Sequence, residues 1–64
     1  MRLKDLREDN DLKQSQIAQM LNIRQNTYSQ YENQKRDIPL EALWKLADFY
    51  GTSIDYLVGR SDEK

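Results

Sequence analysis

A run of uncharged, hydrogen-bonding side chains lies near the middle of this 64-residue chain. Residues 25–31 contain no charge, and Gln25, Asn26, Ser29 and Gln30 share one face of a helix. Exposed helical faces are usually built from Lys, Glu and Arg, which favour helix formation and solubility. A Gln or Asn side chain offers a donor and an acceptor in one plane, which suits adenine in the major groove of DNA. These residue types indicate base recognition, with a solvated amide-rich surface as the plain alternative.

Two short helices are predicted to position this face. The first carries an apolar stripe of helical period at Ile17, Ala18 and Leu21, and the second turns Tyr28 and Tyr31 inward. These stripes place the amides of the second helix on its outer side.

The turn between the two helices centres on Asn22. Asparagine is among the few residues other than glycine that accept a left-handed backbone, so the chain can turn sharply there. Such a turn buries Ile23 beneath the corner and lets the second helix begin near Gln25. The sequence therefore predicts two helices joined by a four-residue turn.

Charge is distributed unevenly along the chain. Residues 13–36 contain four basic residues and one acid, a net charge of +3, whereas the remainder carries −4. The overall charge of −1 argues against binding to polyanions through bulk charge, but the local field governs contacts with phosphate. The distribution indicates an acidic domain with one basic face, or else chance clustering on a small surface.

Composition disfavours several functional classes. The chain has no His, no Cys and no Gly-rich phosphate loop, and its acids lie scattered without metal-ligand spacing. We therefore expect no catalytic residues, no metal, no cofactor and no small-molecule substrate. The lack of Cys fits a reducing cytoplasm, and no signal peptide or long apolar run indicates export or a membrane.

Length and composition predict one small domain. Sixty-four residues with 38% hydrophobic content lie near the lower limit for a self-supporting core, so we expect a free energy of unfolding of only a few kcal/mol. Dimerisation or DNA binding would add to that stability. We expect the core over residues 1–59 and a frayed polar tail over residues 60–64.

Three sequence runs, in order, carry a resemblance to a known family. They are Gln-x-x-Ile-Ala from Gln14, Tyr-Glu-Asn-x-Lys over residues 31–35, and Leu-x-x-Leu-Ala-x-x-Tyr-Gly from Leu43 to Gly51. With these runs, residues 3–59 resemble the DNA-binding domain of phage-repressor and Cro-type transcriptional regulators, the XRE helix-turn-helix family. One such run would be weak support, but three at family spacing are specific.

The resemblance implies an all-α fold, a compact five-helix bundle of the lambda-repressor-like type with a central helix-turn-helix. We expect the first helix over residues 2–9 and the fourth to begin with Pro39 as its first residue and to end at a left-handed Gly51. Ser53 would cap a last short helix. The inward residues of these helices would be Leu3, Leu6, Leu40, Leu43, Leu46, Ala47, Tyr50, Ile54 and Leu57.

The resemblance also implies roles by position. Gln25, Asn26 and Gln30 fall where the family touches base edges, with Ser29 beside them. Family positions that meet backbone phosphates are Gln14, Thr27, Asn33, Lys35 and Arg36. Such phosphate contacts set register and affinity, while base contacts specify sequence.

A family ion pair is matched by Arg7 and Glu32, which would brace the third helix against the first. Some positions depart from the family. Lys13 and Arg24 stand where the second and third helices usually have a capping Ser or Thr; neither can accept a hydrogen bond there, but both could reach phosphate. Gln34 stands where glycine is common, and a left-handed Gln costs roughly 1 kcal/mol.

Trp44 on the fourth helix has two interpretations, a filler of the core or an anchor in a subunit contact, and we favour the filler. Tyr56 and Val58 are further candidates for a dimer patch.

The sequence thus predicts a sequence-specific regulator of transcription that binds double-stranded DNA. By family analogy it is a repressor that binds an inverted-repeat operator as a homodimer with the third helix in the major groove. The alternative is a module of the same shape that binds a partner regulator instead of DNA. The uncharged helical face favours DNA, because a protein partner is more often met by exposed apolar anchors.

Overall fold

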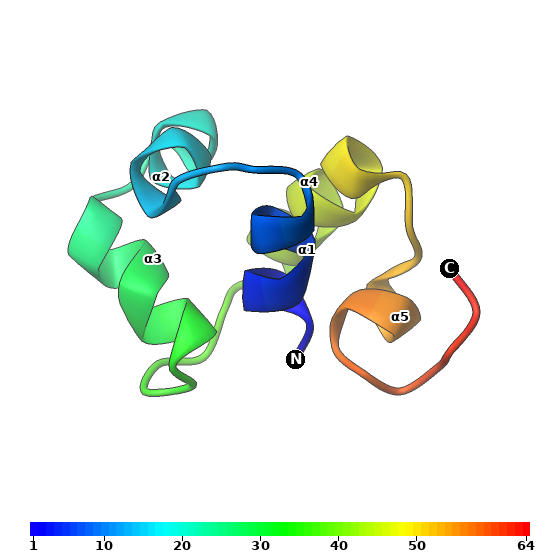
Figure 1. The fold of residues 1–64 in the computed structure, drawn as a ribbon. Coiled ribbons are helices and arrows are strands. Elements are labelled where there is room, and N and C mark those ends of the chain that lie inside the picture. The colour runs from blue at the N-terminus through cyan, green and yellow to red at the C-terminus, as the bar shows by residue number, and fades with distance from the viewer.

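Five helices, and no strand, make up the computed structural model, which describes all 64 residues (Figure 1). The helices are α1 (Leu3–Asp9), α2 (Gln14–Leu21), α3 (Gln25–Glu32), α4 (Leu40–Tyr50) and α5 (Ile54–Leu57). In Figure 1, α2 and α3 form the left end of the molecule, whereas α5 and the C-terminus lie at the right. The predicted all-α, five-helix fold is confirmed.

The core draws on all five helices. It contains eleven buried side chains, all hydrophobic: Leu3, Leu6, Ile17, Ala18, Leu21, Tyr28, Tyr31, Leu43, Leu46, Ala47 and Leu57. The predicted apolar stripes of α2 and α3 are therefore confirmed, and Ile23 packs half-buried against the same core. Because the two stripes meet the core, α2 and α3 pack together and present their other faces to solvent.

All five helices end in the same way. A residue with positive φ follows each of them, and these residues are Asp11, Asn22, Gln34, Gly51 and Gly59. The next residue then donates its backbone N–H to the carbonyl five positions back, as Ile23 does to Ala18 and Lys35 to Gln30, both at 2.9 Å. This is the Schellman motif, which satisfies carbonyls at the helix end. The left-handed turns expected at Asn22 and Gly51 are confirmed, and Gln34 adopts one despite its Cβ.

The start of α4 differs from the prediction. Pro39 has an extended backbone (φ −62°, ψ 150°) and precedes the helix, so Leu40 is its first residue. Leu40 is 58% exposed and Trp44, one turn later, is 57% exposed, so the expected burial of Leu40 and the filler interpretation of Trp44 are both wrong. Leu43, Leu46 and Ala47 define the buried side of α4. Leu40 and Trp44 lie beside that stripe, where no other helix covers them.

The last helix is capped as expected, since the Ser53 hydroxyl accepts a hydrogen bond from the Tyr56 backbone N–H at 3.0 Å. The polar tail after it is held rather than frayed. The Arg2 guanidinium lies 4.1 Å from the centre of the Tyr56 ring and donates to the Ser61 carbonyl at 2.8 Å and to Asp62 at 2.9 Å. Arg2 thus ties the start of the chain to residues 61 and 62.

Candidate nucleic-acid interface

The outer face of α3 carries three unpaired amides. Gln25, Asn26 and Gln30 are exposed, because Tyr28 and Tyr31 occupy the core side of the helix. None of these three side chains forms a hydrogen bond within the protein, whereas those of Gln14, Ser29 and Asn33 do. Each amide therefore keeps its two donors and its acceptor available to a ligand.

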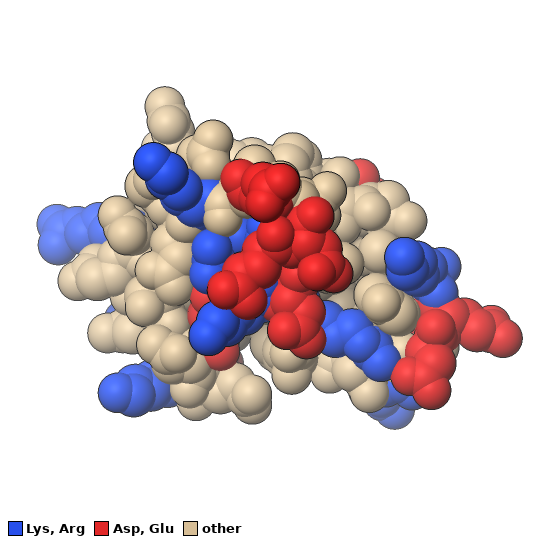
Figure 2. Space-filling model, in the orientation of Figure 1, with Lys and Arg blue, Asp and Glu red and all other residues tan.

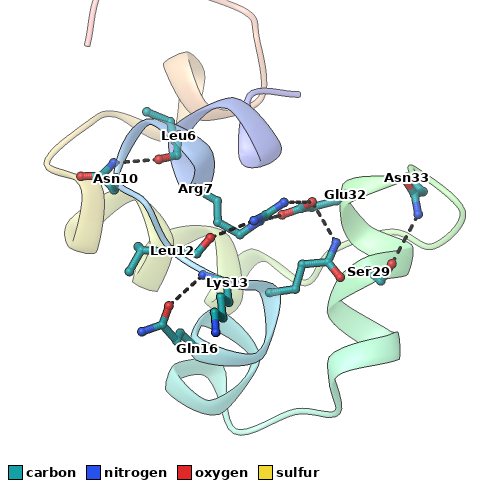
Figure 3. A network of polar contacts seen from close by, with 10 residues as sticks. Leu6, Arg7, Asn10, Leu12, Lys13, Gln16, Ser29, Glu32 and Asn33 are labelled. Carbon is teal, nitrogen blue, oxygen red and sulfur yellow. Dashed lines mark hydrogen bonds and ion pairs between the residues drawn. The ribbon is translucent and has the colours of Figure 1, made fainter.

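Ser29 and Thr27 lie closer to the core than the amides do, and both are half-buried. The Asn33 side-chain amide points back along α3 to the Ser29 hydroxyl at 3.4 Å, a long hydrogen bond (Figure 3). The Ser29 hydroxyl still has its own proton to donate. Ser29 is thus part of the polar face but is less accessible than its neighbours.

The carboxylate of Glu32, the only charged side chain of α3, is turned away from the outer face. Arg7 on α1 donates to it from Nε to Oε2 at 2.6 Å and from Nη2 to Oε1 at 3.2 Å. A third Arg7 bond, from Nη1, reaches the Leu12 carbonyl at 2.8 Å (Figure 3). The side chains of Arg7 and Glu32 are only 13% and 2% exposed. The structure thus joins the two residues of the expected brace through a nearly buried, two-pronged ion pair.

The surroundings of Glu32 keep its carboxylate ionised. Burial alone would raise the pKa of Glu32, but hydrogen bonds from Arg7 and from Gln14 outweigh it and lower the pKa below its ordinary value. The same hydrogen bond to Glu32 raises the pKa of Arg7. Because the Glu32 charge is paired and turned inward, the outer face of α3 carries no charged side chain.

Gln14 forms a hydrogen bond within the protein that the sequence did not predict. We expected it at a backbone phosphate, but its Nε2 donates to Oε1 of Glu32 at 3.1 Å. This bond joins the first residue of α2 to the last residue of α3, eighteen positions away, a contact that no local spacing could indicate. Its second amide proton stays free.

Basic residues flank both ends of α3. Lys13 and Arg24 precede α2 and α3 with extended backbones, and neither side chain caps its helix. The Lys13 backbone N–H is instead satisfied by the Gln16 side chain at 2.8 Å. Because Gln14 touches Glu32, Lys13 lies near the end of α3, where exposed Lys35 and Arg36 follow. All four basic side chains are exposed.

Acidic residues gather elsewhere. Figure 2 shows a group of acidic side chains over α1 at the centre of the view, and basic side chains around the α2–α3 end at the left. The exposed acids in and just after α1 are Asp5, Glu8, Asp9 and Asp11. The uneven charge predicted from the sequence is therefore spread in space as well as along the chain.

Three hydroxyl groups behind α3 and α4 lack partners. They belong to Tyr28, Tyr50 and Thr52, and all three are buried. Burial, followed by the negative charge of Glu32, raises the pKa of Tyr50 from 10.0 to about 12. Burial likewise raises the pKa of Tyr28. These phenols are neutral at physiological pH, and their unmet hydrogen bonds cost stability.

Neither a cluster of metal-binding side chains nor a membrane-spanning helix is present in the structure. No group of three or more Asp or Glu side chains is arranged to hold a metal ion. None of the five helices has both the length and the apolar character needed to cross a membrane.

Known proteins share this architecture. A family model described as helix-turn-helix matches residues 3–57. The chain is 39% identical over 61 residues to the HTH-type transcriptional regulator ImmR of Bacillus subtilis, covering 95% of this chain and 48% of ImmR. It is also 39% identical over 61 residues to the cryptic phage CTXphi transcriptional repressor RstR of Vibrio cholerae, covering 95% of this chain and 55% of RstR.

A solved structure extends the likeness to three dimensions. The crystal structure of a transcriptional regulator from Listeria innocua superposes with a TM-score of 0.89 at 35% identity, covering 98% of this chain and 59% of that one. The chain thus spans about half the length of the relatives it matches. It belongs to the helix-turn-helix family, in its XRE-type, phage-repressor-like branch, whose members are transcriptional regulators and not enzymes.

Proposed function

We propose that this chain is a sequence-specific reader of double-stranded DNA in a transcriptional regulator and that it places α3 in the major groove. The observation that carries the proposal is the outer face of α3, where Gln25, Asn26 and Gln30 are exposed and unpaired while Glu32 is held inward by Arg7. An α-helix with its side chains is about 10–12 Å across, which fits a major groove about 12 Å wide.

Bases and phosphates are met by different residues in this proposal. Gln25, Asn26 and Gln30, with Ser29 beside them, touch base edges and choose the sequence. Contacts with the phosphate backbone come from Lys13, Gln14, Arg24, Thr27, Asn33, Lys35 and Arg36. The position of the basic residues at both ends of α3 supports this division, because phosphates line both sides of the groove.

The brace between Arg7 and Glu32 has two effects here. It fixes the end of α3 relative to α1, which orients the amides. It also neutralises an acid that would otherwise repel phosphate from the end of the reading helix. Gln14 contributes to both effects through its bond to Glu32.

We further propose that two copies bind an inverted repeat as a homodimer and repress transcription sterically, in the cytoplasm. Half-sites would lie one helical turn apart, ~34 Å. Leu40 and Trp44 on α4 are both more than half exposed and offer an apolar surface for the contact between the two copies. Tyr56 and Val58 are half-buried in the core and are weaker candidates for the contact. The printed description of RstR as a phage repressor supports the repressor role by relationship.

A second candidate function is a module that binds a partner regulator protein. The same exposed pair, Leu40 and Trp44, is the observation that favours it, since aromatic anchors are common in protein contacts. That surface lies on α4 rather than on α3, so it does not explain the unpaired amides.

Selection from a random duplex pool at near-physiological salt tests the proposal. The chain is compared with Asn26→Ala/Gln30→Ala, and Gln19→Ala on the exposed side of α2 serves as the matched control. We expect the chain and the control to enrich a short inverted repeat and the double variant to enrich none. If folded chain enriches no duplex at all, DNA reading is wrong and the partner-protein function takes its place.

A further inference from the structure

We propose that α3 reads adenine–thymine pairs, and that the stretch of each half-site beneath it holds two or three of them within about four consecutive base pairs. This inference rests on the proposed function and adds the chemistry of the sequence that is read.

The outer face of α3 lacks the charged side chains that most often read G·C pairs. Guanine is most often read by Arg or Lys, which donate to its O6 and N7, and cytosine by Asp or Glu, which accept from its N4 amino group. Residues 25–31 contain no Arg, Lys, Asp or Glu. The one acid of the helix, Glu32, is 2% exposed and accepts from both Arg7 and Gln14. None of the charged side chains that most often read a G·C pair is therefore exposed on the outer face of α3.

The outer face of α3 instead carries carboxamide side chains, which match adenine. A carboxamide can accept from the adenine N6 amino group and donate to N7 at the same time, which makes Asn and Gln the matched readers of adenine. Gln25, Asn26 and Gln30 are exposed, and no bond within the protein competes for their amides. Three free carboxamides on one short helix are three possible adenine contacts.

The spacing of the amides sets the length of the stretch. Asn26 and Gln30 lie four residues apart, about 6 Å along the helix axis. Base pairs are stacked every 3.4 Å or so, hence the two side chains reach pairs about two steps apart. Gln25 precedes Asn26 and reaches toward the N-terminal side. All three contacts fit within about four base pairs.

One basic residue beside α3, Arg24, could read a guanine next to the adenines. Arg24 is exposed immediately before α3, with an extended backbone and no side-chain hydrogen bond to its helix. A guanine read by Arg24 would lie beyond the amide-read pairs, at the N-terminal end of α3. The variant Arg24→Ala separates that contribution from the amides.

The experiment uses the duplex that the chain selects and replaces its adenines one at a time with 7-deazaadenine. This base keeps Watson–Crick pairing and the minor groove but lacks the N7 acceptor in the major groove. We expect replacement at two or three positions to weaken binding of the chain by about tenfold each, within the range of one bidentate contact. Binding by Gln19→Ala and Arg24→Ala should lose the same factor.

Pairing between residue and base is the decisive readout. Replacing the adenine read by Gln30 with 7-deazaadenine should weaken the affinity of Gln30→Ala by less than twofold, because that variant already lacks the contact. The affinity of Asn26→Ala should likewise change little when the adenine read by Asn26 is replaced. Selected G·C pairs at the positions where these variants lose discrimination would overturn adenine reading while leaving DNA binding intact. Losses that are equal in all variants would also overturn it, since they would reflect duplex shape. Enrichment of no duplex would remove the proposed function and this inference together.

Discussion

The guanidinium of Arg7 on α1 meets the carboxylate of Glu32, the last residue of α3, with 2.6 Å between Nε and Oε2 and with both side chains nearly removed from solvent. The protein's other ion pair, Arg2 with Asp62, leaves the carboxylate 99% exposed. Exposed pairs contribute little to stability, whereas breaking a buried pair leaves an uncompensated charge. The position of α3 thus depends on a side chain of α1.

Replacing Arg7 with alanine should therefore destabilise the domain far more than replacing a surface charge. We expect Arg7→Ala to lower the free energy of unfolding by about 3 kcal/mol, because Glu32 stays buried with only Gln14 to compensate it. Asp62→Ala breaks the exposed pair and should cost below about 1 kcal/mol. Urea unfolding at pH 7 measures both. Equal losses in the free energy of unfolding for the two variants would mean that the buried pair of Arg7 and Glu32 stabilises the fold no more than the exposed pair does.

Acid should weaken the fold through the same carboxylate. Below the ordinary Glu pKa of 4.5 the unfolded chain takes up a proton at Glu32, while the folded chain, with its lowered pKa, stays ionised there. The unfolded state then binds more protons, so stability is lost as pH falls from 4.5 through the folded pKa. Glu32→Gln should start less stable at pH 7 and decline less steeply below pH 4.5. Parallel stability profiles for the two proteins would contradict this assignment.

The Tyr50 hydroxyl is buried without a partner, so its removal should not harm the protein. We expect Tyr50→Phe to leave the free energy of unfolding at pH 7 unchanged or raised by up to about 1 kcal/mol. Alkali gives a second readout. The pKa of Tyr50 is about 12 in the folded protein and 10.0 in the unfolded chain. Between these pH values the unfolded chain ionises at Tyr50 while the folded protein does not, so the free energy of unfolding falls as pH rises. The fall should be shallower in the Phe variant. A loss at pH 7 well above 1 kcal/mol would show that the hydroxyl is satisfied.

Left-handed helix ends provide a paired test of backbone strain. Gln34 has φ 57°, a left-handed conformation that is strained by its Cβ. Gln34→Gly should therefore raise the free energy of unfolding by about 1 kcal/mol. Gly51 has φ 68°, and a Cβ there would meet nothing within 4 Å. Gly51→Ala should therefore cost a similar amount through conformation alone. Thermal unfolding of both variants checks the signs, and a destabilised Gln34→Gly would be inconsistent with strain at that turn.

Much of the fold could be predicted because local rules agree with tertiary packing. The inward pair Tyr28 and Tyr31, the left-handed Asn22 and Gly51, and the Ser53 cap each follow from side-chain period or backbone chemistry within a few residues. In these cases the position in sequence already decides the geometry.

The errors come from information that is not local. Whether Leu40 is covered depends on where other helices end, not on its own period, and it lies in the first turn of α4 with none over it. Arg2 reaches Asp62 across sixty positions, so nothing near either residue indicated that the tail is held. Within the interface, the outward amides of α3 were predictable from the period of the tyrosines. The bond from Gln14 to Glu32 was not, because it depends on how α2 crosses α3.

Binding of two variants across a salt series tests most directly whether α3 reads bases while its flanks hold phosphates. Anisotropy titrations would compare Gln30→Ala and Lys35→Ala with the unaltered chain, on the selected duplex and on a random one. We expect Gln30→Ala to lose ~1–3 kcal/mol on the selected duplex only, and Lys35→Ala to weaken both duplexes and reduce the salt slope by about one unit. Equal losses on both duplexes for Gln30→Ala would contradict the base-reading role of α3.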